Sequence, residues 1–395
     1  MTRAIHREEV FKKRSFFPIF FLWPFCFSCN AQTSSPSILQ PAPGSPIAMT
    51  CSPGNIAAGD INKDGKTDMV ILCGQNRTLT IFSGRGGGQF DVANGSPLLL
   101  PYPPNEIVIG DMNKDGNADL IVGSHDSYVI MILTGDGKGN FDTARSSTVT
   151  MRGGSDPHTH GLGIADLNGD GYTDIVTANS TDNDVSVMLQ NSSGGFLPAS
   201  GSPFAVGRSP YPLTIGDVNN DNHPDIVSTS SHSSSRALTL LSGDGHGNFK
   251  RSDIPLRTAN PWFVAIGDIN KDSFADLVMT HSERSELTVL TGSQNGTFTE
   301  VSGSPFNLGS SAWHVAIADV NGDTNPDVLA AANDGVRLLS GDGKGQFVPA
   351  SGSPFLTGKG TWHLAICDVD ADGKPDVVTS NLESKSISGF LGRPR

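Results

Sequence analysis

Short apolar runs flank a polar loop seven times along the chain. In the first unit, an apolar run at 56–59 precedes the loop, another at 69–72 follows it, and a third at 79–82 alternates apolar with polar residues. Runs of about four to eight residues that are bounded by Gly, Asn and Asp predict β-strands. No stretch keeps an apolar period of 3.6 residues, so we expect almost no helix.

The polar loop has a nine-residue pattern that begins at Asp60, Asp111, Asp166, Asp217, Asp268, Asp319 and Asp368. These starts are 51, 55, 51, 51, 51 and 49 residues apart. Repeats of about 50 residues are typical of solenoids and propellers. A glycine-rich turn and a fourth, more polar strand complete each unit. Four strands in each of seven repeats predict an all-β fold, a seven-bladed β-propeller of four-stranded blades.

The two ends of the repeat region complement each other. The seventh unit stops after its third strand, at 386–390, whereas the segment 41–51 resembles a fourth strand that lacks its first three. We therefore expect this N-terminal strand to complete the last blade and lock the ring. A frayed N-terminal tail is the alternative.

The first 31 residues have a different composition from the repeats. Lys12, Lys13 and Arg14 precede an apolar stretch at 15–28, which is shorter than the roughly 20 residues of a membrane-spanning helix. Small residues near Ala31 suit cleavage, so 1–31 is expected to be a signal peptide, 32–40 a linker and 41–395 the propeller. The expected location is secreted or at the cell surface. An uncleaved anchor and a lipoprotein modified at Cys29 are the alternatives.

The acidic side chains gather in the loops. The formal net charge is −13, which argues against a nucleic-acid partner. Each loop carries oxygen-bearing side chains at positions 1, 3, 5 and 9, and the carbonyl of position 7 adds another ligand, as Lys66 does in the first loop. Ca²⁺ takes about six to eight such oxygens, so the loops predict up to seven Ca²⁺ ions. Asx-type turns without metal are the alternative.

The predicted calcium ligands are the side chains at these four positions of the seven loops: Asp60, Asn62, Asp64, Asp68, Asp111, Asn113, Asp115, Asp119, Asp166, Asn168, Asp170, Asp174, Asp217, Asn219, Asp221, Asp225, Asp268, Asn270, Asp272, Asp276, Asp319, Asn321, Asp323, Asp327, Asp368, Asp370, Asp372 and Asp376. Position 6 is Gly in four loops but Asn222, Ser273 and Thr324 in the fourth to sixth. Positive φ is unfavourable for larger residues, so we expect weaker calcium binding at the fifth and sixth loops.

This loop, together with Gly-Asp-Gly-x-Gly-x-Phe turns at 135–141, 243–249 and 341–347, resembles the FG-GAP/VCBS repeat. That repeat builds the seven-bladed head of integrin α chains and occurs in many secreted bacterial proteins. The resemblance covers roughly residues 41–395 and implies Ca²⁺ loops between the first two strands of each blade. It says little about function, because propellers host many unrelated activities.

One column of residues stands six positions before each loop: Gly54, Asn105, His160, Tyr211, Trp262, Trp313 and Trp362. These residues begin the innermost strands, so their side chains should ring one mouth of the central channel, opposite the loops. The residues that we expect to bind a ligand there are His160, Tyr211, Trp262, Trp313, His314, Trp362, His363 and Glu106. The alternative is that the aromatic side chains only pack blade against blade.

Three functions fit this pattern. The first is a monomeric binding or adhesion module for a carbohydrate or a surface protein, with Trp faces stacking on sugar rings. The second is an enzyme that acts on polysaccharide at the same mouth, with Glu106, His160, His314 and His363 as acid/base groups. The third is a purely structural scaffold. The sequence contains no HExxH motif and no zinc-spaced cysteines, which favours binding over catalysis.

Two further features are left open by the sequence. His158 and His160 form a pair without a third ligand, which is more typical of a surface than of a metal site. Cys51 and Cys73 are expected to lie near each other, either as a disulfide or as two buried thiols, and Cys367 is expected in the core.

Overall fold

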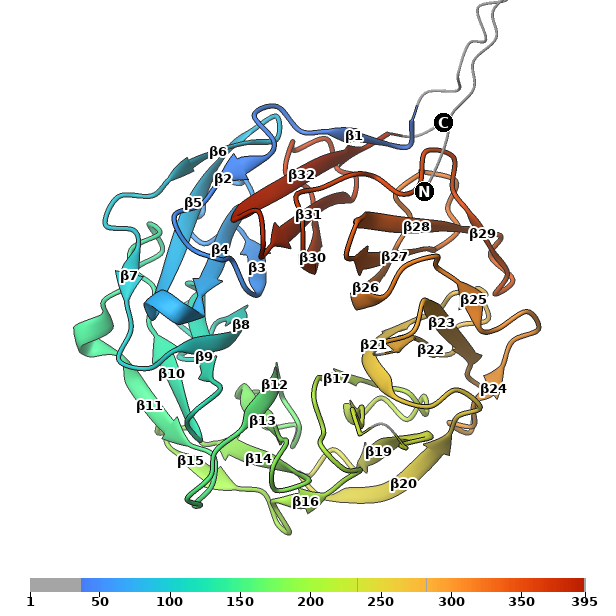
Figure 1. The fold of residues 1–395 in the computed structure, drawn as a ribbon. Helices are drawn as coiled ribbons and strands as arrows, with labels where there is room; N and C mark the ends of the chain where they lie inside the picture. The colour runs from blue at the N-terminus through green and yellow to red at the C-terminus, as the bar shows by residue number, and fades with distance from the viewer. Residues whose placement is uncertain (1–36, 233, 282, 394–395) are drawn as a thin grey trace, which may run out of the picture. The chain divides into compact units, whose positions relative to one another are not determined.

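The computed structural model describes residues 37–393 apart from Ser233 and Ser282. These residues form seven β-sheets arranged as the blades of a ring (Figure 1). The predicted signal peptide, with Cys29, and most of the predicted linker lie outside the described residues. Over the described range there is no α-helix, only the 3₁₀ turns η1 (Gly74–Asn76) and η2 (Thr143–Arg145). None of the described segments is a helix long and apolar enough to cross a membrane.

The innermost strand of each blade lies next to the channel: β3 (Ile56–Gly59), β8 (Pro104–Gly110), β12 (Thr159–Ala165), β17 (Leu213–Gly216), β21 (Pro261–Gly267), β26 (Ala312–Ala318) and β30 (Thr361–Cys367). The second strands pair antiparallel with them: β4 (Asp68–Cys73), β9 (Asp119–Ser124), β13 (Asp174–Asn179), β18 (Asp225–Ser228), β22 (Asp276–His281), β27 (Asp327–Ala332) and β31 (Asp376–Asn381).

The third strands follow: β5 (Thr78–Gly86), β10 (Val129–Leu133), β14 (Asp184–Gln190), β19 (Ala237–Gly243), β23 (Glu286–Thr291), β28 (Gly335–Gly341) and β32 (Ser386–Gly392). Apart from β20, the outer strands are shorter, and several are split: β1 (Leu39–Pro41), β2 (Ile47–Ala48), β6 (Gln89–Val92), β7 (Leu98–Leu99), β11 (Ser147–Thr150), β15 (Phe196–Pro198), β16 (Phe204–Ala205), β20 (Phe249–Pro255), β24 (Thr299–Glu300), β25 (Phe306–Asn307) and β29 (Phe347–Pro349). The predicted all-β propeller of seven four-stranded blades is therefore confirmed.

The second strands are buried along their whole length. Apolar side chains fill the space between neighbouring blades, and one cluster joins Val70 and Leu79 of the first blade to Leu120 and Met131 of the second. Strands with both faces covered read as nearly continuous apolar runs rather than as alternating ones. This explains why residues 69–72 are all apolar.

The last sheet combines both ends of the described chain. Leu39 pairs with Gly392 and Pro41 with Phe390, so β1 lies antiparallel beside β32. After a turn, β2 pairs with the other end of β32. The strand β1 begins at Leu39, within the segment 32–40 that we interpreted as a linker.

A Gly-Ser-Pro sequence, which occurs at 44–46, 95–97, 201–203, 303–305 and 352–354, explains why outer strands are split. In all five copies the serine hydroxyl accepts a hydrogen bond from a backbone N–H of the third strand, as from Ile81 to Ser96 at 2.8 Å and from Gly389 to Ser45 at 2.9 Å. The Ser–Pro peptide bond of each copy is cis. The Gly-Ser-Pro sequence thus fixes the point where the outer strand leaves the sheet. The outer strand then rejoins the sheet as a second short piece.

A disulfide joins Cys51 to Cys73, whose Cα atoms are 5.9 Å apart. It connects the segment that follows β2 to the end of β4 in the first blade, and it settles the pairing that the sequence left open. Cys367 is a free, partly buried thiol that packs against the core between the last and first blades.

Candidate functional site

The nine-residue loops and the aromatic column lie at opposite ends of the innermost strands. In the sixth blade, Trp313 stands at the start of β26, and the loop begins at Asp319, directly after the strand ends at Ala318. The same order holds in the other blades, because the spacing from column to loop is fixed at six residues. The ring therefore has a loop rim and an aromatic rim, which offer different chemistry.

The aspartate at position 9 holds each loop in place by hydrogen bonds. In the first blade, the Asp68 carboxylate accepts hydrogen bonds from the backbone N–H of Ile61 at 3.1 Å and of Gly84 at 2.8 Å. The corresponding aspartates of the other blades accept the same two bonds. Each one ties the loop to the end of the third strand of its blade or to a residue just after that strand. This role is structural and needs no metal ion.

All seven loops share one backbone conformation. Position 6 has a positive φ whether it is Gly65 at 79° or Thr324 at 70°. Position 4 also has a positive φ, as in Lys63 at 61°, which the sequence did not indicate. Asp60 accepts hydrogen bonds from the backbone N–H groups of Asp64 and Gly65. The loop fold therefore overrides the local preference of Thr324.

The side chains of the loops fit a hard cation. In the seventh loop, one carboxylate oxygen each from Asp368, Asp370 and Asp376 lie within 4.8 Å of one another. In the sixth loop, Asn321 Nδ2 lies 3.1 Å from Asp327 Oδ1, so positions 3 and 9 converge there as well. The carboxylate oxygens of the seventh loop suit Ca²⁺ rather than a softer metal.

Without a cation, the charged forms of the buried aspartates destabilise each loop. Burial raises the pKa of Asp327 to about 7, and the carboxylates of Asp323 and Asp319 add to the effect, against the hydrogen bonds from Gly341 and Val320. Burial likewise raises the pKa of Asp276 to about 6. A divalent ion held by the loop side chains would offset this repulsion.

The aromatic rim surrounds a cavity of about 450 Å³. This volume lies in the usual range of small-molecule sites, about 300–1,000 Å³. The cavity is lined by all eight residues that the sequence proposed for ligand binding: Glu106, His160, Tyr211, Trp262, Trp313, His314, Trp362 and His363. Those eight residues come from six different blades, so no single repeat contains the site.

The aromatic rings of the column contact one another around the rim. Ring centroids are 3.9 Å apart for His160 and Tyr211, 4.2 Å for Tyr211 and Trp262, and 5.5 Å for Trp262 and Trp313. Trp313 and Trp362 are stacked at 5.5 Å with an interplanar angle of 30°. The rings thus pack blade against blade, and the same residues also line the cavity.

Hydrogen bonds extend this series of ring contacts around the rest of the rim, where the column has no aromatic residue. Trp362 Nε1 donates to Asn55 Oδ1 at 3.2 Å, and Asn55 Nδ2 donates to Glu106 Oε2 at 2.7 Å. The backbone N–H of Gly161 then donates to Glu106 Oε1 at 3.4 Å. Side chains and backbone therefore form one closed circuit through all seven blades. Asn55 directly follows Gly54 of the column, and the sequence gave no indication of its role.

Several buried polar atoms of the lining have no hydrogen-bond partner within the described residues: Asn105 Oδ1, His160 Nε2, His314 Nδ1 and His363 Nδ1. Buried polar groups are usually paired, and each exception calls for an explanation. Four such atoms belong to residues that line one cavity.

Burial determines the protonation states of the titratable side chains that line the cavity. It raises the pKa of Glu106 to about 7, although the hydrogen bonds from Gly161 and Asn55 oppose the shift. It lowers the pKa of His363 to about 4 and that of His314 well below its ordinary value. Burial, followed by the neighbouring imidazoles of His158 and His125, lowers the pKa of His160 to about 2. At neutral pH these three imidazoles are uncharged.

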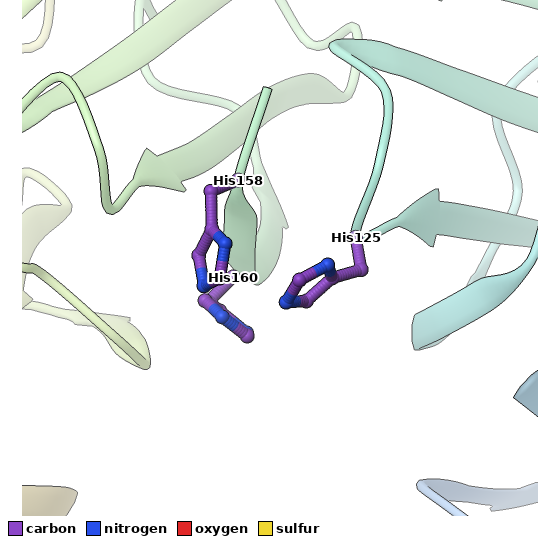
Figure 2. A group of neighbouring side chains, drawn as sticks. All are labelled: His125, His158 and His160. Atoms are coloured by element: carbon purple, nitrogen blue, oxygen red, sulfur yellow. The ribbon is translucent and has the colours of Figure 1, made fainter. Parts of the chain in front are cut away.

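A third histidine joins the pair that the sequence singled out. His125 follows β9 in the second blade, and its ring centroid lies 4.0 Å from that of His158 and 4.8 Å from that of His160 (Figure 2). The interpretation of His158 and His160 as a pair without a third partner is therefore wrong. The position of His125 in the sequence could have indicated this contact. His125 stands six residues after Asp119, the aspartate at position 9 of the second loop, and this spacing brings it back to the aromatic rim.

The chain matches the sequence model of the FG-GAP-like repeat in six overlapping segments: 60–122, 111–177, 166–228, 217–279, 268–330 and 319–379. No curated protein matches it.

Several solved structures share the fold. A chain from the crystal structure of BBS1N in complex with ARL6DN is 13% identical, with 91% of this chain and 98% of that chain covered and a TM-score of 0.62. An Agrocybe aegerita lectin that recognises non-reducing terminal N-acetylglucosamine is 18% identical, with coverages of 85% and 87% and a TM-score of 0.55. Virginiamycin B lyase from Staphylococcus aureus is 14% identical, with coverages of 89% and 98% and a TM-score of 0.57. At these identities the likeness concerns the fold alone.

Proposed function

We propose that this chain, which belongs to the FG-GAP-like repeat family, is a secreted module that binds carbohydrate in the cavity of its aromatic rim. A cell-surface protein that presents the carbohydrate is the expected partner. Calcium ions in the nine-residue loops hold the opposite rim in shape. The lipoprotein alternative at Cys29 gives the same module a membrane anchor.

One observation carries the proposal: the cavity combines aromatic faces with unpaired polar atoms. Trp262, Trp313 and Trp362 are partly exposed at its wall, whereas His314 Nδ1 and His363 Nδ1 lack hydrogen-bond partners elsewhere in the described structure. The C–H face of a sugar ring packs on an indole, and its hydroxyls both donate and accept hydrogen bonds. A ligand pocket with mainly apolar walls and a few convergent polar groups has this composition.

Two further features support this assignment. The Cys51–Cys73 disulfide is typical of an oxidising compartment such as the cell exterior. The lectin from Agrocybe aegerita shares the propeller fold and recognises a terminal sugar.

A glycan array probed with the calcium-loaded protein tests the proposal. We expect a restricted set of glycans to bind, and Trp313→Ala and Trp362→Ala to weaken binding at least tenfold. The matched control is Leu197→Ala, which removes an exposed side chain of β15. Unchanged melting curves must accompany each variant. An array that stays empty, or binding that survives both tryptophan substitutions, would contradict the carbohydrate proposal.

One observation favours the second candidate, an enzyme acting on polysaccharide. A carboxyl group with a pKa of about 7, like that of Glu106, can give or take a proton at neutral pH. Glu106→Gln separates the two functions. It abolishes turnover of a bound polysaccharide if Glu106 is catalytic, and it leaves binding in place if the cavity only binds.

A further inference from the structure

The proposed function gives no role to the grouping of His125, His158 and His160, which form a histidine cluster. The ring centroids of His158 and His160 are 4.6 Å apart, and the three side chains point toward one another (Figure 2). One nitrogen of each ring lies within 4.8 Å of those of the other two. The cluster is built from two blades, since His125 follows β9, His158 directly precedes β12 and His160 lies within β12.

The backbone holds the three residues in place. The N–H of Thr159, between the paired histidines, donates to the carbonyl of His125 at 3.2 Å, and the N–H of Ser180 donates to the carbonyl of His158 at 2.8 Å. The register of β12 shifts between His160 and Leu162. Bulges of this kind redirect side chains and are frequent beside functional sites.

The ring nitrogens are available for a ligand. His160 is 5% exposed, and its Nε2 has no hydrogen-bond partner within the described residues. His125 Nδ1 lies 2.6 Å from Asp126 Oδ1, so its Nε2 is the nitrogen that this carboxylate leaves unengaged. A carboxylate on the far nitrogen of an imidazole is the usual device that orients a metal-binding histidine.

We propose that His125, His158 and His160 bind one divalent transition-metal ion, Zn²⁺ in the first instance. Three imidazoles are the protein ligands of a zinc site that keeps its fourth position open. Tetrahedral zinc with Zn–N bonds of about 2.0–2.1 Å needs nitrogens about 3.3 Å apart. The ring nitrogens, which lie within 4.8 Å of one another, must approach to that distance when the ion binds.

The open position of this site faces the cavity of the aromatic rim, because His125 and His160 both belong to its lining. His160 also stacks on Tyr211 and so links the metal site to the aromatic chain. A bound ion would add a Lewis acid to the wall that carries Glu106. Oxygen groups of a cavity ligand, such as a carboxylate or paired hydroxyls, would complete its coordination. The metal proposal does not depend on which ligand the cavity takes.

Calorimetric titration with Zn²⁺ tests the site in protein kept at about 1 mM Ca²⁺, which occupies extracellular calcium modules. We expect one Zn²⁺ per chain, and a Kd at least tenfold weaker in His125→Ala and His158→Ala. His246→Ala is the matched control, because His246 is an exposed histidine on a turn of the fourth blade. Co²⁺ gives a second readout, a visible absorption band of tetrahedral geometry that the cluster variants should lose.

The proposal is overturned if the wild-type chain binds no Zn²⁺, or binds it equally well after His125→Ala. His160 is buried, so its replacement can disturb the fold; the more exposed His125 and His158 carry the test for that reason. A glycan array run without Zn²⁺ then separates the two proposals. Failure of carbohydrate binding leaves the titration result standing, and the reverse also holds.

Discussion

Trp362 of the seventh blade donates its indole N–H to Asn55 of the first blade at 3.2 Å, although 307 residues separate them in sequence. Asn55 in turn donates to Glu106 of the second blade at 2.7 Å. One amide side chain therefore spans the junction at which the described chain meets its own beginning. The loss of this side chain should affect both the ring and the cavity.

Asn55→Ala is expected to lower the free energy of unfolding by about 1–3 kcal/mol, because it leaves the indole N–H of Trp362 without its partner and removes one of the two hydrogen bonds to the Glu106 carboxyl group. The hydrogen bond from Asn55 lowers the pKa of Glu106, so that pKa should rise further in the variant. Urea unfolding at pH 7 measures the first effect. Asn94→Ala, at an exposed position of the first blade, is the control. Equal stability of both variants would show that the link contributes nothing.

The buried His281 makes the stability of the folded protein depend on pH. Its ring is buried between the carbonyl of Ala259, at 3.0 Å from Nδ1, and the hydroxyl of Thr288, at 2.7 Å from Nε2. Burial lowers the pKa of His281 to about 4. Between pH 6.5 and 4 the unfolded chain binds a proton that the folded chain does not. The stabilisation from neutral His281 is therefore present above pH 6.5 and is lost as the pH falls toward 4.

The size of this loss is about 3 kcal/mol, at roughly 1.4 kcal/mol per pKa unit. Urea unfolding of the wild type and of His281→Gln across this pH range provides the measurement. The difference between the two curves should shrink by that amount on acidification. Parallel curves would mean that His281 titrates normally in the folded protein.

The periodic part of this molecule was predictable from sequence because each blade repeats one geometry. A residue that stands six positions before a loop occupies the same height in every blade, so Trp262, Trp313 and Trp362 had to meet at one rim. The aspartate at position 9 of each loop likewise begins the second strand of its blade. Simple spacing therefore gave the strands, the loops and the lining of the cavity.

Contacts between non-equivalent positions were not predictable in this way. His125 lies at the end of a second strand and His160 at the start of a first strand, so no column of the repeat contains both. The antiparallel pairing of the two strands brings these positions to one rim, and neighbouring blades bring them together. The positive φ of Lys63 was missed for another reason: lysine has no preference for that conformation, and the loop imposes it.

Removal of divalent ions tests the calcium proposal for the loops. The crowded carboxylates of Asp368, Asp370 and Asp376 should repel one another without a cation, so EDTA is expected to lower the melting temperature. A site held at a hundredfold excess over its Kd contributes about 2.7 kcal/mol. EDTA saturated beforehand with Ca²⁺ is the control. An unchanged melting temperature would leave the loops as hydrogen-bonded turns without metal.

The unequal loops allow a test of backbone strain. Thr324 has a φ of 70° at the position where Gly65 has 79°, and a threonine in this region costs about 1–3 kcal/mol. Thr324→Gly should therefore stabilise the protein, by about 1 kcal/mol after the entropy cost of glycine. The contact of the Thr324 hydroxyl with Lys271 is exposed, so its loss matters little.

Gly65→Thr is the reciprocal change in the first loop. No atom lies within 4 Å of a Cβ placed at Gly65, so any loss comes from the backbone conformation alone. We expect it to lower the free energy of unfolding by about 1–3 kcal/mol. Both variants are measured by urea unfolding in EDTA, which removes any contribution from calcium. If the two changes shift stability in the same direction, position 6 carries no strain, and weaker calcium binding at the sixth loop loses its physical basis.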